Sequence, residues 1–302
     1  MEYKEKIINE YAEYLKVIKA NSPQTILIYT REAESFFSYI LKENVTLDDV
    51  AKVTPENIYD YLNHLADNNV CTNTRARAIS ALKSFFEYAR KRLHLIDKNP
   101  AEFVERPKIK KSLPKYATVD EATEILNHVS DFSRHLERDY CILVLFLNCG
   151  LRVSELVNLN VSDIDFSECT MKILGKGNKE RLLFLNKACI KALEEYLYVK
   201  EDENEALFVS QKKERISVRA TQELVKKSLK AAGLEDKGLS THKLRHSAAT
   251  MMYQNGVDLL TLCEILGHEN LNTTKIYTHI SDNQKKEAMF NSPLSNFQKS
   301  KK

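Results

Sequence analysis

The sequence lacks several features that would place the chain in a membrane, outside the cell or around a metal. None of its six cysteines forms a Cys-x-x-Cys pair, which argues against a disulfide framework and a zinc ribbon. No apolar run approaches the ~20 residues that a membrane-spanning helix needs. The N-terminus lacks the charged-then-apolar layout of a signal peptide. We therefore expect a reducing cytosol, no membrane contact and no metal.

Size and composition favour a folded protein of two domains. The chain has 302 residues, of which 43% are hydrophobic, so it can bury a core and is not a disordered protein. It shows no internal repeat.

Net charge is small, but its distribution is uneven. The chain carries only +3, yet residues 75–115 hold twelve Lys or Arg against four acidic residues, which gives +8 there and leaves −5 elsewhere. Such a segment can follow a phosphate backbone, or it can be a solvated helix face and a charged linker. Charge alone does not separate the two. The candidate DNA contacts are Arg75, Arg77, Lys83, Arg90, Lys108, Lys110 and Lys111.

The first hundred residues have the pattern of a helical domain. Ser22-Pro23 and Thr54-Pro55 are helix starts, each with a capping hydroxyl followed by proline. Asn73 or Thr74 could cap a third helix with an apolar seam and a basic opposite face. The seam consists of Ile79, Leu82, Phe86 and Ala89.

A linker is expected next. Asn99-Pro100 breaks the helical pattern, and residues 106–115 combine two prolines with several basic residues. We predict an N-terminal domain over 1–105, a basic linker over 106–115 and a second domain over 116–302.

The second domain is expected to be mostly helical with one β-hairpin. Thr118 to Glu121 form a capping box, and the apolar helix 140–148 can end at Gly150 in the left-handed conformation. Met171 and Ile173, then Leu182 and Phe184, flank the turn 175–178 of a hairpin over 170–185. Asn186 can cap the next helix, and helices resume from Ser217, one of them over 259–266. The predicted fold class is mainly α with a small antiparallel sheet.

Three polar clusters point to chemistry on a phosphodiester. Breaking that bond adds negative charge to the non-bridging oxygens, and arginine suits it because its planar fork binds two oxygens and stays protonated. Arg152 follows the helix-ending glycine, and Glu155, three residues on, could orient a guanidinium. His242 and Arg245 are three apart and share a helix face. Tyr277 could be a nucleophile if positive charge favours its phenolate.

Simpler readings exist for each residue taken alone. Arg152 could be a surface arginine, the histidines could cap helices, and Tyr277 could be a core residue. The spacing of His242 and His246 also fits zinc, but no glutamate lies between them, and two cations beside the site would oppose a dication.

Together the clusters resemble a known family, the tyrosine recombinases or phage-integrase family, most closely its bacterial Xer branch. The N-terminal region with its basic linker is also similar to the family's SAM-like core-binding domain, so the resemblance covers nearly the whole chain. The matching segments, in family order, are Gly150 to Leu156, Gly175 to Arg181, His242 to His246, Leu266 to His268 and Thr273 to Tyr277.

The resemblance implies residue roles. Tyr277 would attack the scissile phosphate and become linked to its 3′ side. Lys176 would protonate the departing 5′ oxygen, with Lys179 a nearby competitor, and His242 would act as general base. Glu155 would support the pocket, and no cofactor is implied. The groups that hold the transition state would be Arg152, Arg245 and His268.

The resemblance also implies an assembly. Four protomers would act on two double-stranded DNA sites through a Holliday junction, each docking a C-terminal tail, with Met289 and Phe290 as anchors, onto a neighbour. A second recombinase or a DNA translocase could be a partner, and the cytoplasm and nucleoid the location. Chromosome-dimer resolution, integration or excision, and inversion share this chemistry. Two alternatives remain at this point: type IB topoisomerase-like relaxation and a catalytically silent DNA-binding regulator.

Overall fold

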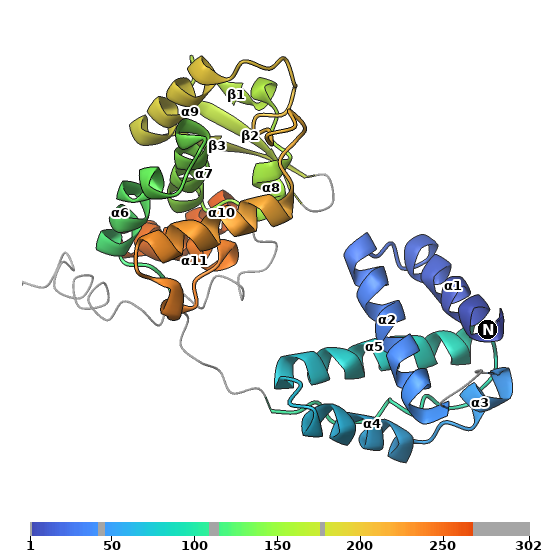
Figure 1. The fold of residues 1–302 in the computed structure, drawn as a ribbon. Coiled ribbons are helices and arrows are strands. Elements are labelled where there is room, and N and C mark those ends of the chain that lie inside the picture. The colour runs from blue at the N-terminus through green and yellow to red at the C-terminus, as the bar shows by residue number, and fades with distance from the viewer. Residues whose placement is uncertain (1, 42–45, 109–114, 176–178, 268–302) are drawn as a thin grey trace, which may run out of the picture. The chain divides into compact units, whose positions relative to one another are not determined.

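The computed structural model describes residues 2–41, 46–108, 115–175 and 179–267 (Figure 1). The chain divides into two compact units, Met1–Ser112 and Leu113–Lys302. Among the described residues, no helix is long and apolar enough to cross a membrane. The predictions that lie outside the described residues concern Lys110, Lys111, Lys176, His268, Tyr277, the hairpin turn 176–178 and the C-terminal tail.

The first unit is made of helices, as predicted, around an aromatic core. Phe36 and Phe37 pack edge to face against Phe85 and Phe86, and Tyr11 adds a further ring against Phe85. All five are at most 1% exposed, so each contributes the burial of a full aromatic ring to this core. The helices are α1 (Glu2–Val17), α2 (Pro23–Leu41), α3 (Leu47–Ala51), α4 (Pro55–Asp67) and α5 (Thr72–Lys91).

Two of the predicted helix starts in this unit are confirmed and one is displaced. The Ser22 hydroxyl accepts from the Thr25 N–H at the start of α2, and Thr54 forms a reciprocal cap with Asn57 at the start of α4. In contrast, α5 begins at Thr72, before either predicted cap, and its N-cap residue Cys71 has the extended backbone such a position needs.

Helix α5 is also buried on more than one face. The predicted seam is buried, but so are Ala76, Ala78 and Ala81, because α5 contacts α1, α2 and α4. Small side chains let neighbouring helices approach it closely. The helix is therefore the centre of the unit, and the expected basic face is narrower than the spacing indicated: Arg77 is exposed, whereas Arg75 is only partly so.

The second unit surrounds the buried helix α7 (Leu136–Cys149), which contacts α9 and α11 (Figure 1). Helix α7 starts four residues before the predicted apolar stretch, and nine of its fourteen residues are buried. The other helices are α6 (Val119–Asn127), η1 (Val129–Asp131), α8 (Val153–Val157), η2 (Val161–Asp163), α9 (Lys187–Val199), α10 (Val218–Ala231), η4 (Glu235–Lys237), α11 (Thr241–Gln254) and α12 (Leu259–Leu266). The predicted caps at Thr118 and Asn186 and the bounds of α12 are confirmed, and Ser240 caps α11.

A small antiparallel sheet completes this unit. The predicted hairpin is present as β2 (Thr170–Leu174) and β3 (Glu180–Phe184), and the unpredicted short strand β1 (Ile164–Asp165) pairs with β2. Met171 and Ile173 face the core. On β3, Leu182 is 57% and Phe184 82% exposed, while Leu183 is buried. Because side chains alternate along a strand, Arg181 lies on the inward face with Leu183.

Candidate active site

Glu155 is the centre of a cluster of three arginines. Its Oε1 accepts from Arg152 Nη1 at 2.6 Å and from Arg181 Nη1 at 2.9 Å. Its Oε2 accepts from the Arg152 backbone N–H and from Arg181 Nη2, each at 2.9 Å, and lies 3.6 Å from Arg245 Nη1. The Arg152 contact is local, because Arg152 is the N-cap residue of α8 and Glu155 its third residue. The structure thus brings together Arg152, Glu155 and Arg245 of the predicted site.

The same three arginines bond to the C-terminal end of α12. Arg181 Nε donates to the Ile265 carbonyl at 2.9 Å, Arg245 Nη2 donates to that of Leu266, and Arg152 Nη2 donates to that of Gly267 at 2.9 Å. The last carbonyls of a helix have no partner within the helix and carry its negative dipole end. The three arginines therefore supply the hydrogen bonds that these carbonyls lack within the helix. They also hold the C-terminal end of α12 against the cluster, just before residue 268.

Gly150 and Gly267 are required for this close packing. Both have a left-handed backbone, with φ of 59° and 60°. A Cβ on Gly150 would lie 2.9 Å from a methyl group of Leu266, and one on Gly267 would lie 3.1 Å from the Arg181 guanidinium. The Gly150 carbonyl accepts a hydrogen bond from Arg245 Nη1 at 2.8 Å. The turn after α7 therefore also positions Arg245, one of the predicted catalytic residues.

The cluster keeps its carboxylate charged. Burial alone would raise the pKa of Glu155, but the hydrogen bonds and charge of Arg181, followed by those of Arg152, outweigh burial and hold this pKa below its usual value. Glu155 therefore stays an acceptor-only group at neutral pH. Its negative charge offsets part of the positive charge of the three neighbouring arginines.

The two histidines of α11 are in direct contact. His242 Nε2 lies 3.0 Å from His246 Nε2, and their rings meet edge to face. Burial, then the charges of Arg245 and Arg152, lower the pKa of His242. Burial, then His242, Arg245 and Lys243, lower the pKa of His246 to about 4. Both rings are therefore held toward the neutral form, and the described residues contain no group of three or more His, Cys, Asp or Glu that could hold a metal ion.

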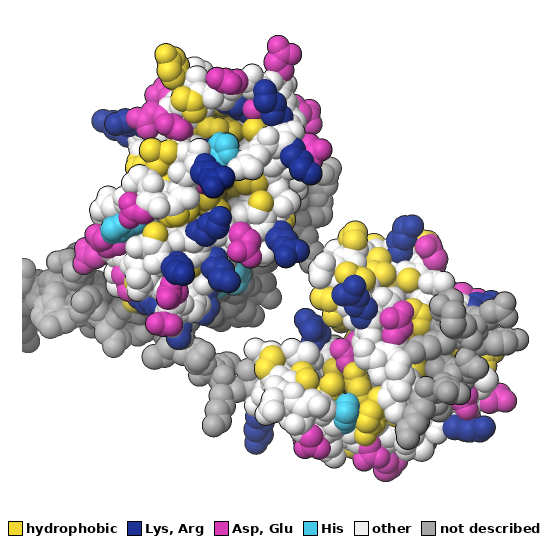
Figure 2. Space-filling view, in the orientation of Figure 1, with side chains coloured by type: hydrophobic (Ala, Val, Ile, Leu, Met, Phe, Trp, Pro, Cys, Tyr) yellow, Lys and Arg dark blue, Asp and Glu magenta, His cyan; other side chains and the backbone are white. Residues whose placement is uncertain are grey.

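The predicted DNA contacts on α5 differ in how far they are already engaged. Arg90 donates twice to Glu87, at 3.1 and 2.9 Å, and Lys83 donates to the Glu102 carbonyl at 2.9 Å. Arg75 has a buried Nε that finds no hydrogen-bond partner among the described residues, and Arg77 is exposed. Figure 2 shows Lys and Arg interspersed with acidic side chains on the visible faces, without a continuous basic patch. Lys108 is exposed at the end of the described linker residues.

Arg181 is a functional candidate to which the sequence assigned no role, although it ends the matching segment Gly175 to Arg181. It bonds to both Glu155 oxygens and to the Ile265 carbonyl of α12. The alternation Arg181, Leu183, Leu185 was the available signal, since it puts an arginine in line with two buried leucines.

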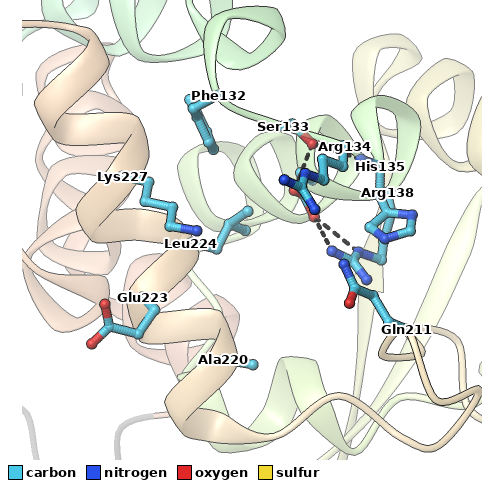
Figure 3. Close-up of a pocket in the computed structure, with 11 residues that line it drawn as sticks. Phe132, Ser133, Arg134, His135, Arg138, Gln211, Ala220, Glu223, Leu224 and Lys227 are labelled. Atoms are coloured by element: carbon cyan, nitrogen blue, oxygen red, sulfur yellow. Dashed lines mark hydrogen bonds and ion pairs between the residues drawn. The ribbon is translucent and has the colours of Figure 1, made fainter.

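A separate pocket of about 580 Å³ lies at the other end of α7 (Figure 3). It is lined in part by Phe132, Arg134, Arg138 and Lys227. None of the predicted site residues that the structure describes lines it. The Arg138 guanidinium there is held by Asp139 and by the Val209 carbonyl.

A cluster of this kind can stabilise an anion that gains charge during a reaction. The Arg152 side chain is 34% exposed, and a guanidinium has five N–H donors, of which Glu155 and Gly267 accept two from this one. The neutral ring of His242 lies near the same charges and can accept a proton. Cations around a fixed carboxylate, beside a neutral imidazole, suit transfer of a phosphoryl group.

The chain belongs to the phage integrase family, the tyrosine recombinases. The family model for the phage integrase family matches residues 115–284, and that for the phage integrase N-terminal SAM-like domain matches residues 8–92. Membership makes the chain a site-specific recombinase by class and confirms the predicted fold class. Neither topoisomerase-like relaxation nor a silent regulator is favoured.

Within the family, the chain is similar to Xer proteins. Tyrosine recombinase XerC of Caldanaerobacter subterraneus subsp. tengcongensis is 42% identical, with 96% of this chain and 87% of the relative covered. Tyrosine recombinase XerD of Halalkalibacterium halodurans is 33% identical, with 91% and 93% covered. The crystal structure of XerH bound to palindromic difH substrate, a post-cleavage complex, has a TM-score of 0.73 at 23% identity, with 94% of this chain and 84% of that chain covered, which supports the fold.

Proposed function

We propose that this recombinase cuts and rejoins DNA at a defined site through a 3′-phosphotyrosine on Tyr277, without metal or ATP. The observation that carries the proposal is the binding of Arg152 and Arg245 around one buried carboxylate, Glu155. Attack by a phenol stores the energy of the phosphodiester in the protein–DNA bond, so a 5′ hydroxyl can reseal the strand without an external energy source.

The proposed roles follow the charge that develops on the phosphate. Arg152, Arg245 and His268 hold the transition state, and Lys176 protonates the 5′ leaving oxygen. His242 accepts the proton of Tyr277, which its lowered pKa supports, because only a neutral imidazole can act as a base. Glu155 orients the arginines.

The proposed assembly uses both units. Residues 1–105 form a core-binding domain, residues 106–115 a basic linker, and residues 116–302 a catalytic domain whose C-terminal tail is exchanged between protomers. Four copies act on two double-stranded sites through a Holliday junction, with a second recombinase or a DNA translocase as possible further partners. The DNA-bound relatives, including XerH on difH, support DNA as the partner.

Covalent attachment to DNA tests the nucleophile. We expect wild-type protein to form an adduct with a nicked suicide duplex in buffer with EDTA and no nucleotide, and Tyr277→Phe to bind this duplex with unchanged affinity and form none. The duplex would carry the genomic sequence at which adducts are mapped in the host. An adduct with Tyr277→Phe would show that another residue is the nucleophile. Dependence of the wild type on added metal or ATP would refute the cofactor-free chemistry.

A further inference from the structure

Arg181 lies where three parts of the catalytic cluster meet, although it reaches them from the sheet. Its three guanidinium nitrogens donate to Ile265, to Glu155 Oε1 and to Glu155 Oε2, each at 2.9 Å. Its side chain is 14% exposed. The planar guanidinium thus binds one carboxylate and one helix-end carbonyl. The pair of parallel bonds to the carboxylate is the arrangement for which the shape of arginine is best suited.

The first consequence concerns Glu155 and, through it, Arg152. Each Glu155 oxygen accepts one hydrogen bond from Arg152 and one from Arg181. A carboxylate held on both edges by two arginines cannot rotate without breaking two charge-assisted bonds. Without Arg181, the buried carboxylate keeps the bonds from the Arg152 backbone and guanidinium but loses the second pair, so Glu155 and the Arg152 guanidinium are held less firmly.

The second consequence concerns the chain on either side of the site. Arg181 holds the Ile265 carbonyl and fills the space where a Gly267 side chain would stand. At the base of the hairpin, a Cβ on Gly175 would lie 3.7 Å from Arg181 Nη1, which is ordinary van der Waals range. The guanidinium therefore supports the backbone leading into residue 268 and lies near Gly175.

We propose that Arg181 is a positioning residue for strand cleavage, which fixes Glu155 and thereby Arg152 without touching the DNA. This rests on the proposed function, since it assigns Arg181 to the same site. The physical basis is preorganisation: arginines stabilise the developing charge only if they already point to where it forms. A misplacement of ~1 Å can cost about 100-fold in rate.

The chain offers a matched control at Arg138. Its side chain is also 14% exposed, and it too binds a buried carboxylate, Asp139, and a backbone carbonyl, that of Val209. It lies about 16 Å along α7 from the end that leads into Arg152. Loss of Arg138 therefore removes the same kinds of bonds away from the site.

The experiment compares Arg181→Gln, Arg181→Lys and Arg138→Gln on the nicked suicide duplex. The rate constant of adduct formation is measured in a single turnover with all DNA bound, beside the Kd for the duplex and the Tm. We expect both Arg181 variants to cleave about 100-fold more slowly with Kd nearly unchanged. The lysine variant stays slow because one ammonium cannot replace the fork, and it serves if the glutamine variant does not fold. Arg138→Gln should lower the Tm and keep the wild-type rate.

Each result decides the proposal. Wild-type rates in the Arg181 variants, or an equal loss of rate in Arg138→Gln, would overturn it. In a duplex with a 5′-bridging sulfur, the 5′ strand leaves as a thiolate. It needs no protonating acid, because a thiolate is a better leaving group than an alkoxide. If that duplex restored the Arg181→Gln rate, Arg181 would act through the hairpin lysine and not through Glu155 and Arg152. If wild-type protein itself formed no adduct, the proposed function would fail first, and this inference with it.

Discussion

The contact between His246 and His242 predicts a specific pH dependence of stability. Burial and the neighbouring charges hold the pKa of His246 at about 4 in the folded chain, whereas an unfolded histidine titrates near ~6.5. Below pH 6.5, His246 is therefore protonated in the unfolded chain, whereas it stays neutral in the folded chain until the pH approaches 4. Stability from this group is present above about pH 6.5 and falls as the pH drops toward 4.

The size of the effect follows from the width of that window. One pKa unit corresponds to ~1.4 kcal/mol, so His246 should cost about 2 kcal/mol of folding free energy between pH 7.5 and pH 5. The variant His246→Gln has no group that titrates in this range, and its amide can still hydrogen-bond to His242. Its stability should consequently fall by about 2 kcal/mol less than that of the wild type over the same interval.

Equilibrium urea unfolding of the full chain at a series of pH values measures this difference directly. Groups common to both proteins that lie away from His246, including the carboxylates, cancel in the comparison. His135→Gln, which removes an exposed histidine in the loop before α7, is the control for general effects of the substitution. If wild type and His246→Gln changed in parallel within about 0.5 kcal/mol, the reasoning from burial and local charge would be refuted.

Two further predictions concern the carboxylate and the basic helix. Glu155→Gln should lower the free energy of unfolding by roughly 3 kcal/mol, because it leaves buried arginines without their counter-charge; a loss below about 1 kcal/mol in urea unfolding at pH 7 would contradict this. Arg77→Ala should weaken DNA binding and reduce the slope of log Kd against log salt by about 1, whereas Arg90→Ala should have a smaller effect because Glu87 already neutralises it. Both variants would be titrated against salt on the same duplex. Equal losses of DNA affinity would show that the ion pair with Glu87 does not keep Arg90 from binding DNA.

Local signals predicted much of this fold. The capping residues Thr54, Thr118 and Asn186 each start a helix, since the bond they make is to a backbone N–H three residues away. Gly150 ends α7 in the left-handed conformation for an equally local reason.

The errors occur where distant contacts decide. Helix α5 begins at Thr72 without a side-chain cap, and its packing against three other helices buries faces that spacing alone left exposed. On β3 the apolar residues Leu182 and Phe184 face outward, because the inward face is occupied by Arg181 and Leu183. No local pattern shows that an arginine on a strand will meet a glutamate 26 residues away.

The same contrast applies to the site. The grouping of Arg152, Glu155, His242 and Arg245 was expected from motif order, and the structure brings the first, second and fourth into one cluster. That the arginines also bond to three successive carbonyls at the end of α12 was not foreseeable, since a carbonyl belongs to every residue and leaves no mark in the sequence.

Arg245 joins the ends of two helices, because its guanidinium donates to the Gly150 carbonyl after α7 and to the Leu266 carbonyl of α12. A substitution at this position removes those bonds along with a cation, so the variant protein is expected to be exposed to proteases in the cell for a larger share of the time. In a genetic screen for inactive variants, the apparent effect of a substitution at residue 245 would then depend partly on the steady-state amount of the variant protein. Immunoblots of steady-state levels are therefore needed before such a screen can be interpreted as enzymology.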